Sequence, residues 1–159
     1  MKKSLADYLQ KGNISNITTY QAGILQSVVN RTLQKHSDTI LRKYGLTKMH
    51  WLILGSILDA QNKGVRITDL AKTLGTTLPY LTTTINLLES KGMVARANHE
   101  TDSRAKLVVI DPAFAERCQE IESAMRTALR KTIYANVDPE DFHTYMKVLY
   151  QLSQMQESY

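Results

Sequence analysis

A segment in the middle of the chain combines a buried apolar stripe with an exposed face that is neutral and polar. Stepping about 100° per residue along a helix from Leu81 places Ile85 and Leu88 on the same side. The opposite side carries a proline and short polar side chains, namely Pro79, Thr83, Asn86 and Ser90, flanked by Tyr80 and Thr82. Neutral hydroxyl and amide groups on one narrow helix can read base edges in a DNA major groove, whose width admits one α-helix. Polar faces of this kind are also common on helices that only pack, so both readings stay open.

Positive charge follows this segment on a predicted hairpin. Two strand-like stretches, 93–97 and 105–110, are separated by the polar stretch 98–103. Arg96, Arg104 and Lys106 lie on or beside these strands, where side chains can contact the phosphate backbone or the minor groove.

The segments before the hairpin predict a helix-turn-helix. Residues 65–67 form a short extended piece, and Thr68 is expected to cap a brief helix that reaches Leu74 and stops at Gly75. Thr77 is expected to cap the next helix, with Pro79 in its first turn, and Gly92 ends it. Two helices joined by a tight turn and followed by a hairpin predict a winged helix-turn-helix.

Long amphipathic helices are predicted on both sides of this unit. An apolar stripe runs over 17–44 without proline and ends at Gly45, and Thr47 is expected to cap a helix from residue 48 to about residue 61. A further stripe spans 114–133. After a break at 137–139, where Asp138 is expected to act as a cap, a last helix covers 142–155. The stripes over 17–44 and 142–155 hold more apolar surface than a small winged helix covers, so they predict a second copy of the chain, or else intramolecular packing.

Composition fits one basic domain with modest extensions. The chain has 159 residues, with 20 Lys and Arg against 15 Asp and Glu, which gives a net charge of +5. A basic balance suits a polyanionic partner, although many proteins that bind no nucleic acid share it. The longest apolar run, 51–54, is far too short to span a membrane, and residues 1–10 lack the apolar core of a signal peptide, so we expect a cytoplasmic protein without a membrane partner.

Enzymatic and metal chemistry find no support in the sequence. There is no glycine-rich phosphate loop and no Gly-x-Ser-x-Gly elbow, so we expect neither an enzyme nor a cofactor. The four histidines have no spacing that gathers metal ligands, so no metal site is expected. Cys118, the single cysteine, falls on an apolar helix face, where a structural role is favoured over redox sensing.

Residues 66–110 resemble the winged helix of the multiple antibiotic resistance regulator (MarR) family. The matching elements are ITDLAKTLG, LTTTINLLESKGMV and, most specifically, Asp102-Ser103-Arg104 followed by the strand 107–110. The flanking helices match as well, so the resemblance covers nearly the whole chain. It implies a mainly α fold with a small β-hairpin wing, divided into an N-terminal arm and dimerisation helix (1–45), a DNA-binding winged helix (46–111) and C-terminal helices that complete the dimer interface (112–159).

The resemblance implies a homodimeric transcription factor, by family habit a repressor, on a pseudo-palindromic operator. Arg104 would enter the minor groove at the wing, and Asp102 would orient a wing arginine. The predicted DNA-binding residues are Thr77, Pro79, Tyr80, Thr82, Thr83, Asn86, Arg96, Asp102, Arg104 and Lys106. The alternative function is a protein-interaction module whose winged helix has lost DNA reading.

One departure from the family pattern bears on specificity. Family recognition helices usually carry exposed arginines, whereas this one has none between Leu78 and Ser90. Base reading then falls to its threonines, Tyr80 and Asn86; the amide of Asn86 can bond adenine bidentately, and threonine methyls and Pro79 can touch thymine methyls. We therefore expect an A·T-rich operator, with much of the affinity coming from the wings and the phosphates.

Members of the family commonly release DNA when a small anionic or phenolic ligand binds between the dimer helices and the winged helix. The helices that would border such a pocket carry the candidates Tyr20, Arg31, His36, Tyr44 and Trp51. Each of the five also fits a role in the core or in the dimer interface.

Overall fold

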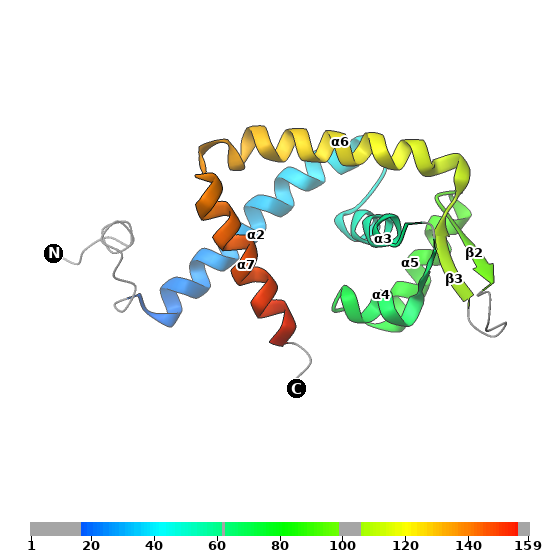
Figure 1. The fold of residues 1–159 in the computed structure, drawn as a ribbon, viewed down its shortest axis with the longest axis horizontal. Coiled ribbons are helices and arrows are strands. Elements are labelled where there is room, and N and C mark those ends of the chain that lie inside the picture. The colour runs from blue at the N-terminus through cyan, green and yellow to red at the C-terminus, as the bar shows by residue number, and fades with distance from the viewer. Residues whose placement is uncertain (1–16, 62, 99–105, 156–159) are drawn as a thin grey trace.

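The computed structural model of the chain describes residues 17–61, 63–98 and 106–155. Three long helices, α2, α6 and α7, form an extended arm, and the shorter helices and the strands gather under one end of α6 (Figure 1). The elements are α2 (Thr19–Leu41), η1 (Arg42–Tyr44), α3 (Lys48–Asp59), β1 (Val65–Arg66), α4 (Ile67–Thr73), α5 (Leu78–Ser90), β2 (Val94–Asn98), β3 (Lys106–Ile110), η2 (Pro112–Phe114), α6 (Ala115–Thr132), η3 (Tyr134–Asn136) and α7 (Pro139–Gln154). This is the predicted order of helices around a hairpin, and the mainly α fold class is confirmed.

Side-chain caps fix where several helices begin. The Thr47 hydroxyl accepts from the backbone N–H of His50 at 3.2 Å, and His50 Nδ1 accepts from the backbone N–H of Thr47 at 3.3 Å, so the predicted cap of α3 is a reciprocal capping box. The predicted cap at Asp138 is also confirmed, because its carboxylate accepts from the N–H groups of Glu140 and Asp141.

The predicted cap at Thr68 is wrong. Helix α4 begins two residues earlier, with Arg66 at its N-cap position and no side-chain capping bond. The reason is that Val65 and Arg66 pair with β3 as a strand, so the chain passes directly from the sheet into the helix. Thr77 does hold the N-cap position of α5, but its side chain makes no capping bond there.

The hairpin belongs to a three-stranded sheet of order β1-β3-β2. Strands β2 and β3 pair antiparallel, with Val94 opposite Ile110 and Asn98 opposite Lys106, which confirms the predicted hairpin. The two-residue strand β1 joins the other edge of β3. Gly64 permits this approach: its φ is +74°, and a Cβ there would lie 2.9 Å from Leu107 Cβ.

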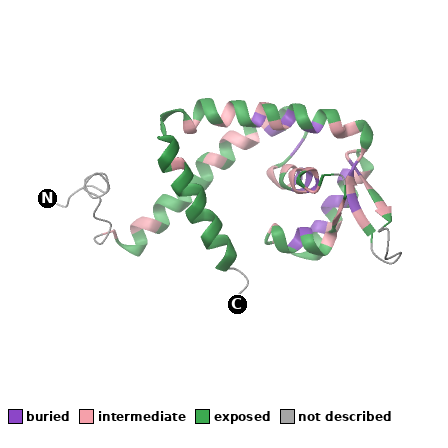
Figure 2. Ribbon diagram, in the orientation of Figure 1, coloured by how far each residue is buried: buried purple, intermediate pink, exposed green. Residues whose placement is uncertain are grey.

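The buried core lies in the winged helix, in the part of α6 that covers it and at the end of α2, where Leu41 is buried (Figure 2). The predicted stripe of α5, Leu81, Ile85 and Leu88, is completely buried. Cys118 on α6 is buried too, and burial raises the pKa of its thiol to about 11, which leaves little thiolate at neutral pH. Helix α7 contributes no buried residue. Among the residues that the structure describes, no helix is both long and apolar enough to cross a membrane.

The His50 cap predicts a pH-dependent stability. Burial and, secondarily, the charge of Lys91 lower the pKa of His50, and its Nδ1 must be unprotonated to accept from Thr47. His50 therefore binds a proton more readily in the unfolded chain than in the native chain. The contribution of His50 to the free energy of unfolding is complete above the unfolded pKa of about 6.5 and falls as the pH drops below it.

We expect urea unfolding at about pH 7.5 and about pH 5.5 to give a larger loss of stability for the wild type than for His50→Gln. Glutamine keeps a carbonyl acceptor for the Thr47 N–H but does not titrate. Equal losses in the two proteins would contradict this assignment.

Candidate nucleic-acid interface

The outer face of α5 is a row of exposed, uncharged side chains. Pro79, Tyr80, Thr83 and Asn86 are exposed and Thr82 is partly so, as the helical periodicity predicted. The Thr83 hydroxyl donates to the Pro79 carbonyl at 3.1 Å. Its proton is thereby used within the helix, so the oxygen is left as an acceptor and the methyl group as an apolar contact.

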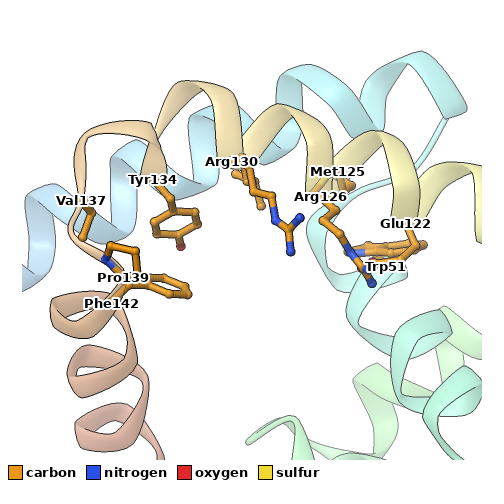
Figure 3. A pocket seen from close by; sticks show the side chains of 10 residues that line it. Trp51, Glu122, Met125, Arg126, Arg130, Tyr134, Val137, Pro139 and Phe142 are labelled. Atoms are coloured by element: carbon orange, nitrogen blue, oxygen red, sulfur yellow. The ribbon is translucent and has the colours of Figure 1, made fainter.

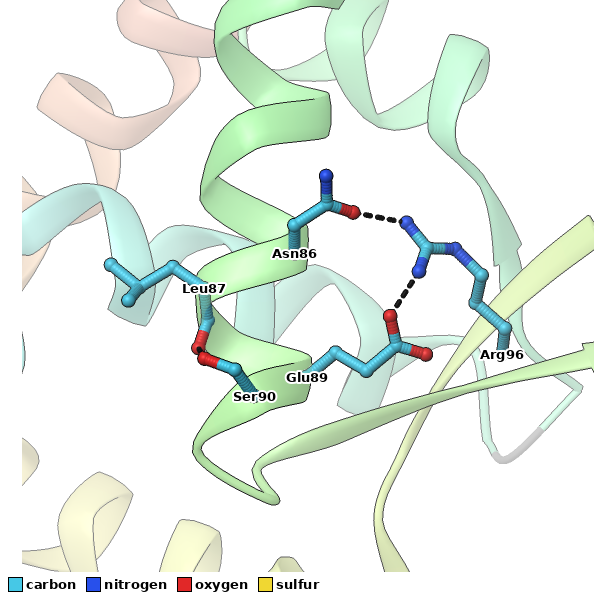
Figure 4. Close-up of polar contacts among 5 residues, drawn as sticks. All are labelled: Asn86, Leu87, Glu89, Ser90 and Arg96. Atoms are coloured by element: carbon cyan, nitrogen blue, oxygen red, sulfur yellow. Dashed lines mark hydrogen bonds and ion pairs between the residues drawn. The ribbon is translucent and has the colours of Figure 1, made fainter.

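Arg96 reaches from β2 onto this face of α5. Its Nη2 donates to Asn86 Oδ1 at 2.5 Å, and its Nη1 forms an ion pair with Glu89, one turn further along the helix (Figure 4). The guanidinium therefore lies beside the helix surface, whereas the sequence analysis assigned it to the wing alone. No motif predicts the contact, because it depends on how the sheet packs against α5.

The hairpin supplies a second cation. Lys106 Nζ donates to Asn98 Oδ1 across the β2–β3 pair, and both side chains are exposed. Asp102 and Arg104, the most specific part of the predicted wing, lie outside the described residues. Thr77 is exposed immediately before α5. The structure thus brings the neutral face of α5 together with two basic side chains, Arg96 and Lys106, from the adjoining sheet.

A separate cavity of about 580 Å³ lies where α3, α6 and α7 meet (Figure 3). Its walls are aromatic: Trp51 lies at one end, and Tyr134 and Phe142, with ring centroids 4.5 Å apart, lie at the other. Arg126 and Arg130, one turn apart on α6, add positive charge. Arg126 pairs with Glu122 at 3.0 Å, whereas Arg130 has no ion-pair partner among the described residues. Aromatic walls with an available guanidinium suit an aromatic or phenolic anion.

The five predicted pocket residues do not surround one cavity. Trp51 lines the cavity just described, and Arg31 borders a different, polar hollow on α2. Tyr20 is 74% exposed, His36 is half-buried on α2, and the ring of Tyr44 lies 4.9 Å from the Arg117 guanidinium. The basic residues of α6 were not among the predicted pocket residues, although the four-residue spacing of Arg126 and Arg130 places both on one helix face.

The arm carries an apolar groove, about 550 Å³ in volume, between α2 and α7. Apolar side chains from both helices line it, namely Leu25, Val29 and Leu33 from α2 and Tyr145, Val148, Leu149 and Leu152 from α7. Val29 is 42% exposed and Leu149 is 41% exposed. We call this surface the arm groove.

Metal chemistry has no candidate in the part of the chain that the structure describes. No group of three or more His, Cys, Asp or Glu side chains there could hold a metal ion.

Comparison with known proteins identifies the fold. A model described as the MarR family matches residues 44–105, which cover α3, β1, α4, α5 and β2 and end just before β3. AbsC, a MarR family transcriptional regulator from Streptomyces coelicolor, is similar with a TM-score of 0.77 and 21% identity over 90% of this chain and 98% of that chain.

Two other solved structures hold a bound partner. A mutant MarR from E. coli complexed with operator DNA matches with a TM-score of 0.72 and 25% identity over 82% of this chain and 91% of that chain. CouR from Rhodococcus jostii RHA1, bound to p-coumaroyl-CoA, matches with a TM-score of 0.76 and 18% identity over 88% of this chain and 94% of that chain.

Proposed function

We propose that this chain, whose residues 44–105 match the MarR family model, is a winged-helix transcriptional regulator and not an enzyme, and that it acts as a homodimeric repressor released from its operator by a small ligand. The observation that carries the proposal is the exposed neutral face of α5, flanked by Arg96 and Lys106 on one side of the winged helix. In this proposal the N-terminal segment (1–45) and the last helices (112–159) dimerise, and the unit 46–111 binds DNA.

Docking of α5 in a major groove would place Thr82, Thr83 and Asn86 against base edges, with Tyr80 near the start of the helix. The hairpin would then lie along the backbone, where Lys106 neutralises phosphate and the Asp102–Arg104 segment takes the wing role that the family resemblance implies. Threonine methyl groups and the absence of arginine from α5 favour an operator that is A·T-rich overall.

The arm groove supports the dimer. Helix α7 buries none of its residues in the single chain (Figure 2). Its side chains Tyr145, Leu149 and Leu152 line the arm groove together with Val29 of α2. Apolar surface of this extent is normally covered in solution. The groove lies between the helix before the winged helix and the last helix of the chain, so a second copy could cover both at once and hold two α5 helices at a fixed separation.

The cavity at Trp51 supports the ligand. It joins α3 of the winged helix to α6 and α7, so a molecule bound there contacts both the DNA-binding part and the arm. A ligand that binds better to one relative placement of these parts shifts the equilibrium toward that placement. CouR is a structural relative that holds an aromatic acyl thioester, which is consistent with a ligand of the same general chemistry.

Salt dependence tests DNA binding against the alternative of a protein-interaction module, which the arginine-free α5 favours. Binding to duplex DNA should weaken with a log–log slope of about −0.9 per phosphate neutralised. Lys106→Ala should weaken binding by a similar factor on all sequences and reduce the slope by about one contact. Lys63→Ala, which removes an exposed lysine from the turn before β1, is the matched control. A complex that is insensitive to salt would contradict DNA binding.

The dimer is tested by Leu149→Asp, which places a charge in the arm groove. Size-exclusion chromatography with light scattering should give twice the 18.0 kDa chain mass for the wild type and a lower mass for the variant. Lys147→Asp, on the same helix but directed away from the arm groove, should stay dimeric. A wild type that elutes as a single chain would rule out the proposed dimer.

The cavity is tested with salicylate as the probe, read through the fluorescence of Trp51, the one tryptophan of the chain. We expect a saturable change in the wild type and roughly tenfold weaker binding in Arg130→Ala, because a charge-assisted hydrogen bond is lost. Lys131→Ala removes the same charge from the neighbouring position outside the cavity and should bind normally. Equal losses in the two variants would contradict the site.

A further inference from the structure

We propose that Arg96 determines base specificity: held by Glu89, it fixes the Asn86 amide so that the two residues select guanine at the base step that Asn86 meets. The inference rests on the proposed function, since it assumes that α5 lies in the major groove. It assigns to Arg96 a role other than the phosphate contact expected from the sequence.

The orientation of the Asn86 amide follows from the chemistry of its partner. A guanidinium carries N–H donors and no acceptor, so only the amide oxygen can face it. Arg96 Nη2 therefore donates a charge-assisted hydrogen bond to Asn86 Oδ1, with 2.5 Å between the two atoms. The Asn86 NH₂ group consequently points away from Arg96 (Figure 4).

Glu89 makes this orientation persistent. Its carboxylate pairs with Nη1 of the same guanidinium while Nη2 holds Asn86, so both ends of the planar group are engaged by α5. The two side chains of the ion pair are 32% and 36% exposed. Ion pairs this exposed contribute little to stability, so substitutions here can change the amide orientation without unfolding the protein.

This arrangement disfavours adenine. Bidentate recognition of adenine needs the amide oxygen and NH₂ to face N6 and N7 of the same base together. Here the oxygen is engaged by a cation, and that cation would also lie near the adenine amino group, which is a donor. Guanine instead presents two acceptors, N7 and O6, which suit the NH₂ of Asn86 and the neighbouring guanidinium alike.

Guanine at this step replaces the bidentate adenine contact that the sequence alone suggested for Asn86. The expectation for the other steps is unchanged, because it depends on the threonines and Pro79. The inferred operator is therefore A·T-rich with a guanine at one symmetric position in each half-site.

The test uses the full-length protein and duplexes selected from a random pool. Loss of preference in Asn86→Ala identifies the base step that this residue reads. At that step the wild type should favour guanine over adenine by about tenfold or more, and Arg96→Ala should lose that preference or turn it toward adenine, because the amide is free to rotate. Arg96→Lys, which still donates to Oδ1, should retain part of it.

Two further variants separate orientation from charge. Glu89→Gln loosens the hold on Arg96 and should lower the guanine preference while every charge of the hairpin remains. Lys106→Ala should weaken binding equally for guanine and adenine, as a phosphate contact does. Thermal melting of each variant shows whether it is folded.

The outcomes are distinguishable. If the wild type enriches no motif, the proposed function fails and this inference fails with it. If a motif is enriched but the Asn86 step is adenine, only this inference fails. It fails equally if Arg96→Ala weakens all sequences alike and keeps the guanine preference, since Arg96 would then be a phosphate contact.

Discussion

The burial of one side of α5 determines what the rest of the molecule can present. Leu81, Ile85 and Leu88 are completely withdrawn from solvent into the core formed with α3, α4, the sheet and α6. Burial of each side chain of this size stabilises the fold by roughly 1.5–3 kcal/mol. Rotating the helix about its axis would therefore cost more free energy than new surface contacts supply. The opposite face is thereby fixed outward, and Asn86 and Thr83 stand on it. The adjoining sheet then brings Arg96 and Lys106 to the same side.

The exposed arm reflects a second constraint of the same kind. One end of helix α6 packs on the winged helix, where Cys118, Ile121 and Met125 are buried. The other end of α6 leads to α7. Helix α7 buries none of its residues, and its apolar side chains Leu149 and Leu152 are 41% and 51% exposed (Figure 2). The cavity at Trp51 lies where the winged helix meets the arm, so a molecule bound there contacts both parts.

Much of this could be predicted from the sequence because it is local. Helical periodicity identified the buried stripe of α5, and Thr47 and Asp138 marked where α3 and α7 begin. The predictions were wrong or incomplete where contacts between distant segments decide the structure. The two-residue strand β1 is too short for any periodicity, and its pairing with β3 moved the start of α4 from the predicted Thr68 cap. The Arg96–Asn86 contact joins residues ten apart through the packing of the sheet on α5, and the cavity needs three helices that are distant in sequence.

In the proposed complex α5 reads DNA sequence as one half of a symmetric pair. The decisive experiment is to sequence the duplexes that the protein binds from a random pool at moderate salt. We expect a two-fold symmetric motif whose half-sites are centred about one helical turn, roughly 10 base pairs, apart, with an A·T-rich composition around one guanine step. Binding without any enriched sequence, or a motif without two-fold symmetry, would contradict it.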